Sequence, residues 1–578
     1  MKLRLLLSLI CLFVIFCVVS PVVAQKQKDN FGTEFWLGYG PNEGGETYDA
    51  NGNARLNETK NVMDLYITSH AATHGSVEVT ALSFFQAFTT TPGQITTIHL
   101  PSGNFAGPSV EVVDVEKVLH GLSVHVTSDS EIAVFGLNHK EYSSDAFMGL
   151  PNNVLGTEYR TINYFTSNTG RPAPGEFWII GTVDSTNIRV TLRAASSLGT
   201  PANSPFRIRL NKGDMYLVQG AGVETNDLTG SHIEADHPVA VFSGHMRCAI
   251  PFNARTTDGS VSRDHVVEEL PPVSAWGDTA IVVPYSSSKQ PDLVRAVCAE
   301  DQTEITVNDS SVGVFNAGDF YEIEALPGVT AIQGSKPIMV GQFMHTSLTG
   351  IGNSPYGDPA LALVVPVEQF ATPGTIVSIM DPTSFTGNFV NVVVDRSDVN
   401  SIMLDGAQMN ASEFQNIDGS RFAYAQHQLQ QGTHTITGGL PFGATVYALG
   451  PVDSYAYTGG ALLNTITPPT PMGVASSFAD RVLSVDFQDL WPNPISPGDD
   501  GVKIAYLSTT DGTLRAIITD MEGRETGRMS WTITSCEAQE EIPSSALPKS
   551  GIAFVRLEAR DAGGRLIATR FTKAAILP

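Results

Sequence analysis

The stretch RDHVVEELPPVSAWG, at residues 263–277, carries side chains that can do chemistry. Within six residues it places one imidazole and three carboxylates, in Asp264, His265, Glu268 and Glu269. Neighbouring carboxylates can act as a general acid and base, and carboxylates together with an imidazole can ligate a metal ion. The same residues can also belong to a scaffold, so the surrounding pattern has to decide between the two.

The pattern recurs in the loops at residues 143–156, 262–277 and 356–370. Each loop has an aspartate, a short apolar run and a proline: Asp145 with Pro151, Asp264 with Pro271, and Asp358 with Pro366. The imidazole does not recur, since Ala146 and Pro359 stand where His265 stands. We interpret the shared pattern as a loop closure in which the aspartate caps a turn and the proline ends a strand. A site private to the second loop is the alternative.

Other histidines give no stronger signal for a reactive site. His139, His245 and His345 recur at the ends of apolar runs, where we expect capping or packing, with metal ligation as the alternative. His70 and His74 lie four residues apart, but on a strand they do not share a face as they would on a helix. No H-E-x-x-H, G-x-S-x-G or phosphate-binding loop occurs. The sequence therefore predicts no catalytic residue, no metal and no cofactor.

Two kinds of surface are candidates for binding. The aromatic side chains around residues 34–42 and 276–285 could form a face, because tryptophan and tyrosine are enriched in binding hot spots, or they could equally be core. The loops at 139–153, 246–264 and 345–358 follow matching strands and should cluster at one end. The candidate binding residues are Trp36, Tyr39, His139, Asp145, His245, Asp264, His265, Trp276, His345 and Asp358.

Strands must position these loops. Apolar residues alternate in hairpins with polar turns, a period that indicates strands with one buried face. A further strand follows each hairpin, and a third apolar element returns at 126–139, 233–246 and 332–345. This predicts an all-β chain of repeated sandwich-like or propeller-like units, either in a row or in a closed ring. The units are expected at about 31–164, 170–285, 290–380 and 385–463.

The N-terminal residues predict export. Lys2 and Arg4 precede a long apolar run, and small residues end at Ala24, which is typical of a secretory signal peptide at 1–24 that is cleaved before Gln25. No later stretch is long and apolar enough to span a bilayer. The formal net charge of −25 argues against nucleic acid as a partner.

Cysteines contribute little to the expected stability. Outside the predicted signal peptide the chain has three, Cys248, Cys298 and Cys536. A bridge between the first two is one option, but this low, odd count requires that apolar cores supply most of the stability.

Five ordered blocks resemble a known family: FGTEFWLGYGPNE, PVAVFSGHMRC, DHVVEELPPVSAWG, KPIMVGQFM and PFGATVYALGPVDSYAYTGG. They are similar to the amino-terminal domain of IgG Fc-binding protein and its bacterial relatives, and they cover about residues 31–463 of a region delimited as 25–464. In a bacterial relative this resemblance implies extracellular binding or adhesion. The family often has a second cysteine just before Asp264, but Arg263 stands there, which removes the partner for a short disulfide from Cys248.

The end of the chain differs in composition. Residues 465–484 are rich in Pro, Ser and Thr and indicate a linker, and residues 485–578 alternate over six or seven short strands, which suggests a small Ig-like sandwich. The region resembles the carboxy-terminal sorting domain of type IX secretion cargo, which implies a bacterium of the Bacteroidetes type. The residues that carry this resemblance include Trp491, Pro492, Asn493, Pro494, Asp520 and Gly523.

Together these features predict a non-enzymatic binding or adhesion protein that recognises an extracellular protein or glycan. It would cross the periplasm, use the type IX secretion machinery, and then be released or stay on the outer-membrane surface. An exported hydrolase acting on glycan or peptide is one alternative, and a structural surface or matrix component is another.

Overall fold

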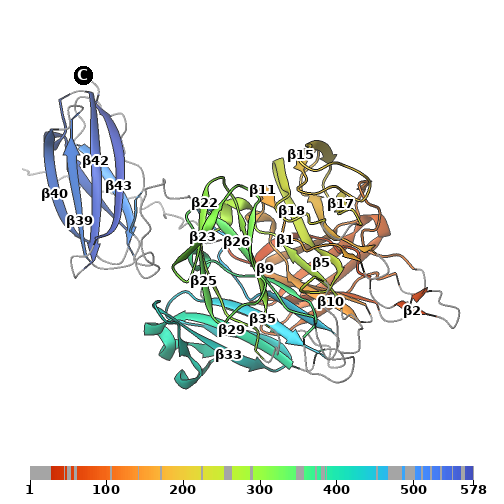
Figure 1. Cartoon of the computed structure of the whole chain (residues 1–578). Coiled ribbons are helices and arrows are strands. Elements are labelled where there is room, and N and C mark those ends of the chain that lie inside the picture. The colour runs from red at the N-terminus through yellow and green to blue at the C-terminus, as the bar shows by residue number, and fades with distance from the viewer. Residues whose placement is uncertain are drawn as a thin grey trace, which may run out of the picture.

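Strands form nearly all the regular structure in the computed structural model, and its helices are single 3₁₀ turns or little more (Figure 1). Among the described residues, no helix has the length and apolar character that crossing a membrane requires. The structure describes residues 28–43, 46–48, 54–56, 61–103, 107–140, 142–168, 172–222, 226–252, 263–286, 291–346, 357–371, 374–378, 385, 387–450, 453–466, 485–487, 501–508, 512–520, 524–533, 537–549, 551–561 and 566–576.

The first unit is built around one 17-residue strand, β9 (Val124–Lys140). The first part of β9 pairs with β1 and β5, and its later part pairs with β4 and β10, so two sheets share one strand. The unit contains β1 (Gly32–Leu37), β2 (Glu46–Tyr48), β3 (Ala54–Leu56), β4 (Val62–Thr68), β5 (Thr73–Val79), η1 (Thr80–Leu82), β6 (Phe84–Thr90), β7 (Thr96–His99) and β10 (Ser143–Met148).

The second unit repeats this plan around β18 (His232–Cys248), also 17 residues long. The first part of β18 pairs with β11 and β15, and its later part pairs with β14 and β19. The other strands are β8 (Val118–Leu119), β11 (Gly156–Arg160), β12 (Ser167–Asn168), β13 (Pro172–Ala173), β14 (Gly175–Gly181), β15 (Thr186–Thr191), β16 (Phe206–Leu210), β17 (Met215–Gln219) and β19 (Asp264–Glu269).

In the third and fourth units the long strand is divided in two. Pro337 lies in the break between β25 (Thr330–Gly334) and β26 (Ile338–Phe343), and Pro441 lies in the break between β34 (Gly432–Thr437) and β35 (Gly443–Leu449). Each half pairs with the strands of its own unit that correspond to the partners of the undivided strands. β25 pairs with β20 and β22, and β26 with β21 and β27; β34 pairs with β28 and β30, and β35 with β29 and β36. The remaining strands are β20 (Thr279–Val282), β21 (Leu293–Cys298), β22 (Thr303–Val307), β23 (Ser310–Phe315), β24 (Phe320–Ile323), β27 (Leu361–Leu363), β28 (Gly374–Ser378), β29 (Gly387–Asp395), β30 (Met403–Leu404), β31 (Ala407–Gln408), β32 (Gln415–Asn416), β33 (Phe422–Leu429) and β36 (Ser454–Thr458).

The predicted all-β fold of repeated units is confirmed. The strand pairing also shows a fourth copy of the third apolar element, which was not recognised from the sequence. β34 and β35 are the fourth copy of the third apolar element. Pairing also groups the strands differently from the expected unit limits, because β11, β20 and β28 each pair with the long strand that follows them in the chain.

Short 3₁₀ helices follow three of the units. They are η3 (Asn152–Val154), η4 (Val273–Ala275) and η5 (Val367–Gln369), and each begins directly after a proline: Pro151, Pro272 or Pro366. The proline in the second unit is therefore Pro272 rather than the neighbouring Pro271 that the sequence comparison chose. The chain packs tightly after these turns, since a Cβ on Gly156 would lie 2.5 Å from the Cβ of Pro272. Elsewhere lie η6 (Arg396–Ser401) and η7 (Ala411–Glu413).

The four units form a closed ring rather than a row. Their innermost strands, here called the axial strands, are β10, β19, β27 and β36, and each contacts the next around the cycle, with β36 returning to β10. The first and last described residues of the ring region complete the closure. Leu463 N–H donates to Lys28 O at 2.7 Å, and Asp29 forms a β-bridge with Leu462. One apolar core contains residues of the first and fourth units together.

Residues after 484 form two further sheets with their own core (Figure 1). One sheet has the order β37-β38-β41 and the other β40-β39-β42-β43, so the described part has seven strands. The strands are β37 (Val485–Phe487), β38 (Gly501–Ser508), β39 (Gly512–Thr519), β40 (Glu525–Ile533), β41 (Glu537–Pro543), β42 (Gly551–Asp561) and β43 (Leu566–Ile576), with η8 (Ser544–Ala546) before β42.

Candidate functional site

The ring axis brings together the recurring aspartates. Asp145, at the third position of β10, is fully buried and accepts hydrogen bonds from one backbone N–H of every unit. The donors are Ala146 at 2.9 Å, Val267 at 3.0 Å, Leu361 at 3.1 Å and Ala456 at 3.1 Å. One carboxyl group therefore fixes four axial strands to each other.

Three more aspartates from the other units lie at the same end of the axial strands. They are Asp264, Asp358 and Asp453, all buried. Asp264 accepts from the backbone N–H groups of Ser144 and His265, the latter at 2.9 Å. Ser454 joins neighbouring strands, because its hydroxyl accepts from Asp358 N at 2.8 Å.

Two glutamates of β19 extend the acidic axis toward the other end of the axial strands. Glu268 accepts from Leu363 N in the third unit at 3.2 Å, and Glu269 accepts from Leu150 N in the first unit at 2.8 Å. We call Asp145, Asp264, Asp358, Asp453, Glu268 and Glu269 the acidic axis. Asp145, Asp264, Glu268 and Glu269 accept backbone N–H groups that the converging strands would otherwise leave unpaired.

Burial changes the protonation of this region. Loss of solvation raises the pKa of Asp145, Glu268 and Glu269 well above their usual values, although backbone N–H donors oppose the rise. The pKa of Asp264 rises for the same reason, with repulsion from Asp358 and Asp453 adding to it. Burial therefore disfavours the ionised form of these four carboxyl groups, and the backbone N–H donors offset part of that cost.

Buried histidines stay neutral. Burial lowers the pKa of His245 and of His265 to about 3. His245 Nε2 donates to Phe165 O at 2.9 Å, while its Nδ1 accepts from Arg247 N at 3.0 Å, which fixes one tautomer. Within the described ranges, no group of three or more His, Cys, Asp or Glu side chains is arranged to hold a metal ion.

The ten candidate binding residues do not form an exposed face, and their burial agrees with the core alternative for the aromatic residues and with the expected packing of the histidines. Six of them lie on the strands β1, β9, β10, β18 and β19, and the other four lie between strands. The aromatic ones are core: Trp36 stacks on His125 with ring centroids 3.8 Å apart. The ten are Trp36, Tyr39, His139, Asp145, His245, Asp264, His265, Trp276, His345 and Asp358, none more than 8% exposed.

The interpretation of residues 263–277 as scaffold agrees with this geometry. Residues 264–269 form β19, an axial strand that is buried along its whole length. Its carboxylates bind backbone N–H groups of neighbouring units instead of converging on a cleft.

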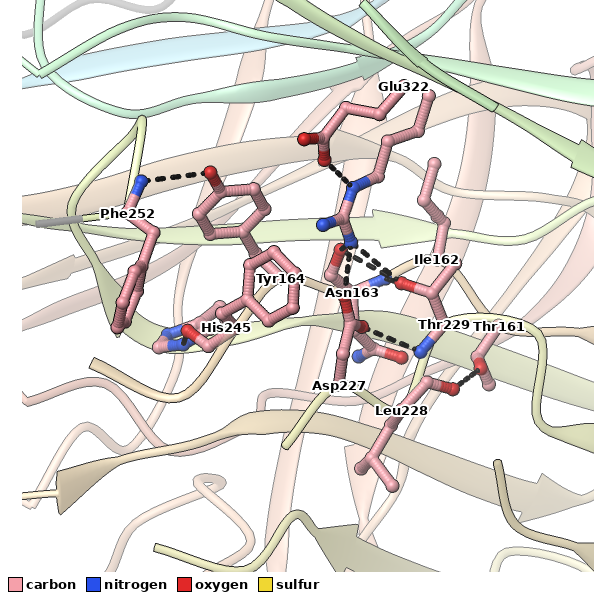
Figure 2. Close-up of polar contacts among 12 residues, drawn as sticks. Thr161, Ile162, Asn163, Tyr164, Asp227, Leu228, Thr229, His245, Phe252 and Glu322 are labelled. Atoms are coloured by element: carbon pink, nitrogen blue, oxygen red, sulfur yellow. Dashed lines mark hydrogen bonds and ion pairs between the residues drawn. The ribbon is translucent and has the colours of Figure 1, made fainter. Parts of the chain in front are cut away.

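A second buried polar cluster joins the second and third units around Arg295 of β21, which is 0% exposed. Its guanidinium donates to Asn163 O at 2.6 Å, Asp227 Oδ2 at 2.7 Å and Glu322 Oε2 at 2.8 Å (Figure 2). Aromatic rings enclose it, with the centroid of Tyr164 at 4.6 Å. Attraction to the two carboxylates outweighs the effect of burial and keeps the pKa of Arg295 above its usual value.

Sequence reasoning missed two of these residues. Asp453 ends the block GPVD, and the apolar run after it repeats the pattern of the three recognised loops. Arg295 stands inside the apolar run LVRAVC, where a lone charge signals an internal ion pair.

The structure describes some of the remaining candidate residues and not others. Cys248 and Cys298 are both buried and free, so the optional bridge between them is not formed. Asp520 closes a hairpin, accepting from Arg524 N at 2.9 Å between β39 and β40. The predicted cleavage site at Ala24 and Gln25, Cys536, and the motif residues Trp491, Pro492, Asn493, Pro494 and Gly523 lie outside the described residues.

Comparisons with known proteins give one informative relative and several uninformative ones. Human IgGFc-binding protein is 26% identical over 435 residues, which are 72% of this chain but only 7% of that protein. A solved structure of latent PorU from Porphyromonas gingivalis covers 59% of this chain and 31% of its own, with 10% identity and a TM-score of 0.15. A tetra-tandem repeat of a large adhesion protein covers 69% and 92%, with 12% identity and a TM-score of 0.14. Scores this low do not indicate a shared fold.

A family model also matches more than half of this chain. The model described as IgGFc binding protein matches residues 145–448, from Asp145 on the ring axis to Ala448 in β35. The matched segment contains axial strands of the second and third units and the Arg295 cluster. This chain therefore belongs to the IgGFc-binding protein family.

Proposed function

We propose that this chain is a secreted or surface-displayed binding protein, without enzymatic activity, that contacts an extracellular protein or glycan. Family membership supports binding as the general activity. The ring supplies the observation that carries the proposal. Ser454, next to Asp453, donates its N–H to Asp264 at 3.4 Å and accepts from Asp358 N at 2.8 Å, so three units meet at one end of the axial strands. The segments that lead into these strands therefore start from one small area.

Those segments are the proposed contact surface. Residues 246–264 and 345–358 lead into β19 and β27, and residues 449–454 lead into β36. The axial strands into which they lead form a rigid support, because these strands are buried and bonded to each other through Asp145. Binding loops on a rigid scaffold lose less conformational freedom when a ligand binds.

The proposal extends to export and to the division of the chain. Residues 1–24 would be the signal peptide, 25–464 the binding region, 465–484 a linker and 485–578 a type IX sorting domain. The separate core of the last region supports its independence. Removal of this domain or anchoring through it would follow passage across the outer membrane.

A pull-down with the mature chain, residues 25–578, tests the function. Immobilised IgG Fc, mucin-type glycoproteins and polysaccharides serve as separate targets. Replacing residues 254–261 with a Gly-Ser segment of equal length should abolish capture of whichever target binds. Leu198→Ser, on an exposed turn elsewhere in the second unit, is the matched control and should bind normally. Unchanged capture by the loop variant would contradict the proposed contact surface.

A further inference from the structure

A cavity lies at the other end of the ring axis, away from the proposed contact loops. Its volume is about 60 Å³, and all four units contribute to its lining. Met148 comes from the first unit, Glu269 and Trp276 from the second, Met339 and Leu363 from the third, and Leu462 from the fourth. The volume exceeds the roughly 30 Å³ share of one water molecule in the liquid.

The lining is almost entirely apolar, and its polar side chains are largely engaged elsewhere. Gln369 donates to Ala275 O at 2.9 Å and to Asn464 O at 2.7 Å, and Thr458 donates to Leu363 O at 2.6 Å. Glu268 accepts the N–H of Leu363. Little capacity for hydrogen bonding therefore remains inside the cavity.

Glu269 is the exception. Its side chain is buried, and its Oε2 accepts from Leu150 N at 2.8 Å, but its Oε1 has no hydrogen-bond partner among the described residues. Leaving a buried carboxyl oxygen without a partner is unfavourable. A water molecule placed there would need two to four polar partners, whereas this cavity offers one oxygen beside alkyl groups.

We propose that this cavity binds a small aliphatic molecule that carries one oxygen acceptor, such as a short branched alcohol, ketone or acyl compound. Burial raises the pKa of Glu269 and so favours its neutral acid form. Because Oε2 already accepts an N–H, the acid proton sits on Oε1 and is donated to the oxygen of the ligand. The alkyl part of the ligand contacts Met148, Met339 and Leu363. This site is independent of the proposed loop surface.

Methionine-methyl NMR of the mature chain tests the site, because Met148 and Met339 line the cavity while the buried Met215 does not. The probe is acetone, and its control is isobutene, which has the same shape without the oxygen. Acetone should shift the Met148 and Met339 resonances saturably and leave Met215 unchanged. Isobutene should bind at least tenfold more weakly, which corresponds to about 1.4 kcal/mol.

Variants test the cavity and the hydrogen bond from Glu269 independently. Glu269→Gln keeps a donor and should retain acetone binding, whereas Glu269→Leu should weaken it at least tenfold. Leu363→Trp fills the cavity and should abolish the shifts, while an unchanged Met215 resonance shows that each variant folds. No saturable shift with either probe would overturn the site. Equal binding of acetone and isobutene, or full binding by Glu269→Leu, would overturn the assigned hydrogen bond.

Discussion

The carboxyl group of Asp145 is the acceptor that all four units share. Both of its oxygens accept two backbone N–H groups each, and the donors belong to four different axial strands. Asparagine would keep the size of the side chain but replace one of these oxygens with a donor. Two buried N–H groups would then face an NH₂ group instead of an acceptor.

We expect Asp145→Asn to reduce the free energy of unfolding by roughly 2–5 kcal/mol, because unsatisfied buried groups cost about 1–3 kcal/mol each. Urea denaturation followed by circular dichroism at pH 7 measures the loss. Asp114→Asn is the control, since Asp114 forms only an exposed ion pair with Lys117 and should lose less than about 1 kcal/mol. Equal losses in the two variants would show that Asp145 does not join the units.

A second prediction for a single residue concerns Asp292, in the interface between the third and fourth units. Burial raises its pKa to about 7, although Tyr285 N and Gln342 Nε2, both at 2.8 Å, oppose the rise. The folded state therefore binds more protons than the unfolded state between about pH 4 and 7. Its contribution to stability is complete below the unfolded pKa and declines as the pH rises through that interval.

Asp292→Asn removes this titration. The stability of the original protein relative to the variant should fall by about 1.4 kcal/mol per pH unit between pH 4.5 and 6.5, and level off above pH 7. Urea midpoints for both proteins at pH 4.5, 5.5, 6.5 and 8 provide the comparison. A stability difference that does not change with pH would mean that the carboxyl group is ionised throughout.

At the scale of elements, the sequence predicted strands well but not how they are shared. The alternating residues of β15 and the wholly apolar run of β14 were recognised as a hairpin. The long strand β18 was recognised only as an apolar element, because the pairing of its two parts with different sheets depends on residues far away in the chain. The same limit explains why the sequence did not show that β11, β20 and β28 pair with strands about 50 or more residues later in the chain.

Arg295 tests how two elements of neighbouring units are held together. Arg295→Met leaves Asp227, on the second unit, and Glu322, on the third, without their buried cation. We expect a loss of roughly 3–5 kcal/mol in unfolding free energy, as for other broken buried pairs. Arg189→Met is the matched control, because its pair with Glu234 is exposed and should contribute about 1 kcal/mol or less. Similar effects would mean that the Arg295 cluster contributes no more than a surface ion pair.

At the scale of the whole molecule, the ring and the C-terminal sheets have separate cores. Residues of β37 to β43 form one core, and the ring residues form the others. The contacts that close the ring involve residues 28–29 and 462–466. The last two of these residues, 465 and 466, are the first two of the predicted linker, and the others lie before it. The ring therefore has its complete set of closing contacts without the C-terminal region.

Deleting residues 470–578 should consequently leave the melting temperature of the ring within about 2 °C of its value in the full chain. Calorimetry of the full chain should show two transitions, and the shortened chain should keep one of them. A large drop in the melting temperature of the ring would show that the C-terminal region supports it.

The sequence by itself determined the class of structure: period-two apolar patterns require strands, and repeated blocks require related units. It also favoured a scaffold role for the Asp264 stretch, because only its aspartate, apolar run and proline recur. Only the tertiary structure decided that the units close into a ring and that the recurring aspartates and histidines are buried. Closure depends on contacts between β36 and β10, some 300 residues apart, and no local pattern specifies such a distant pairing.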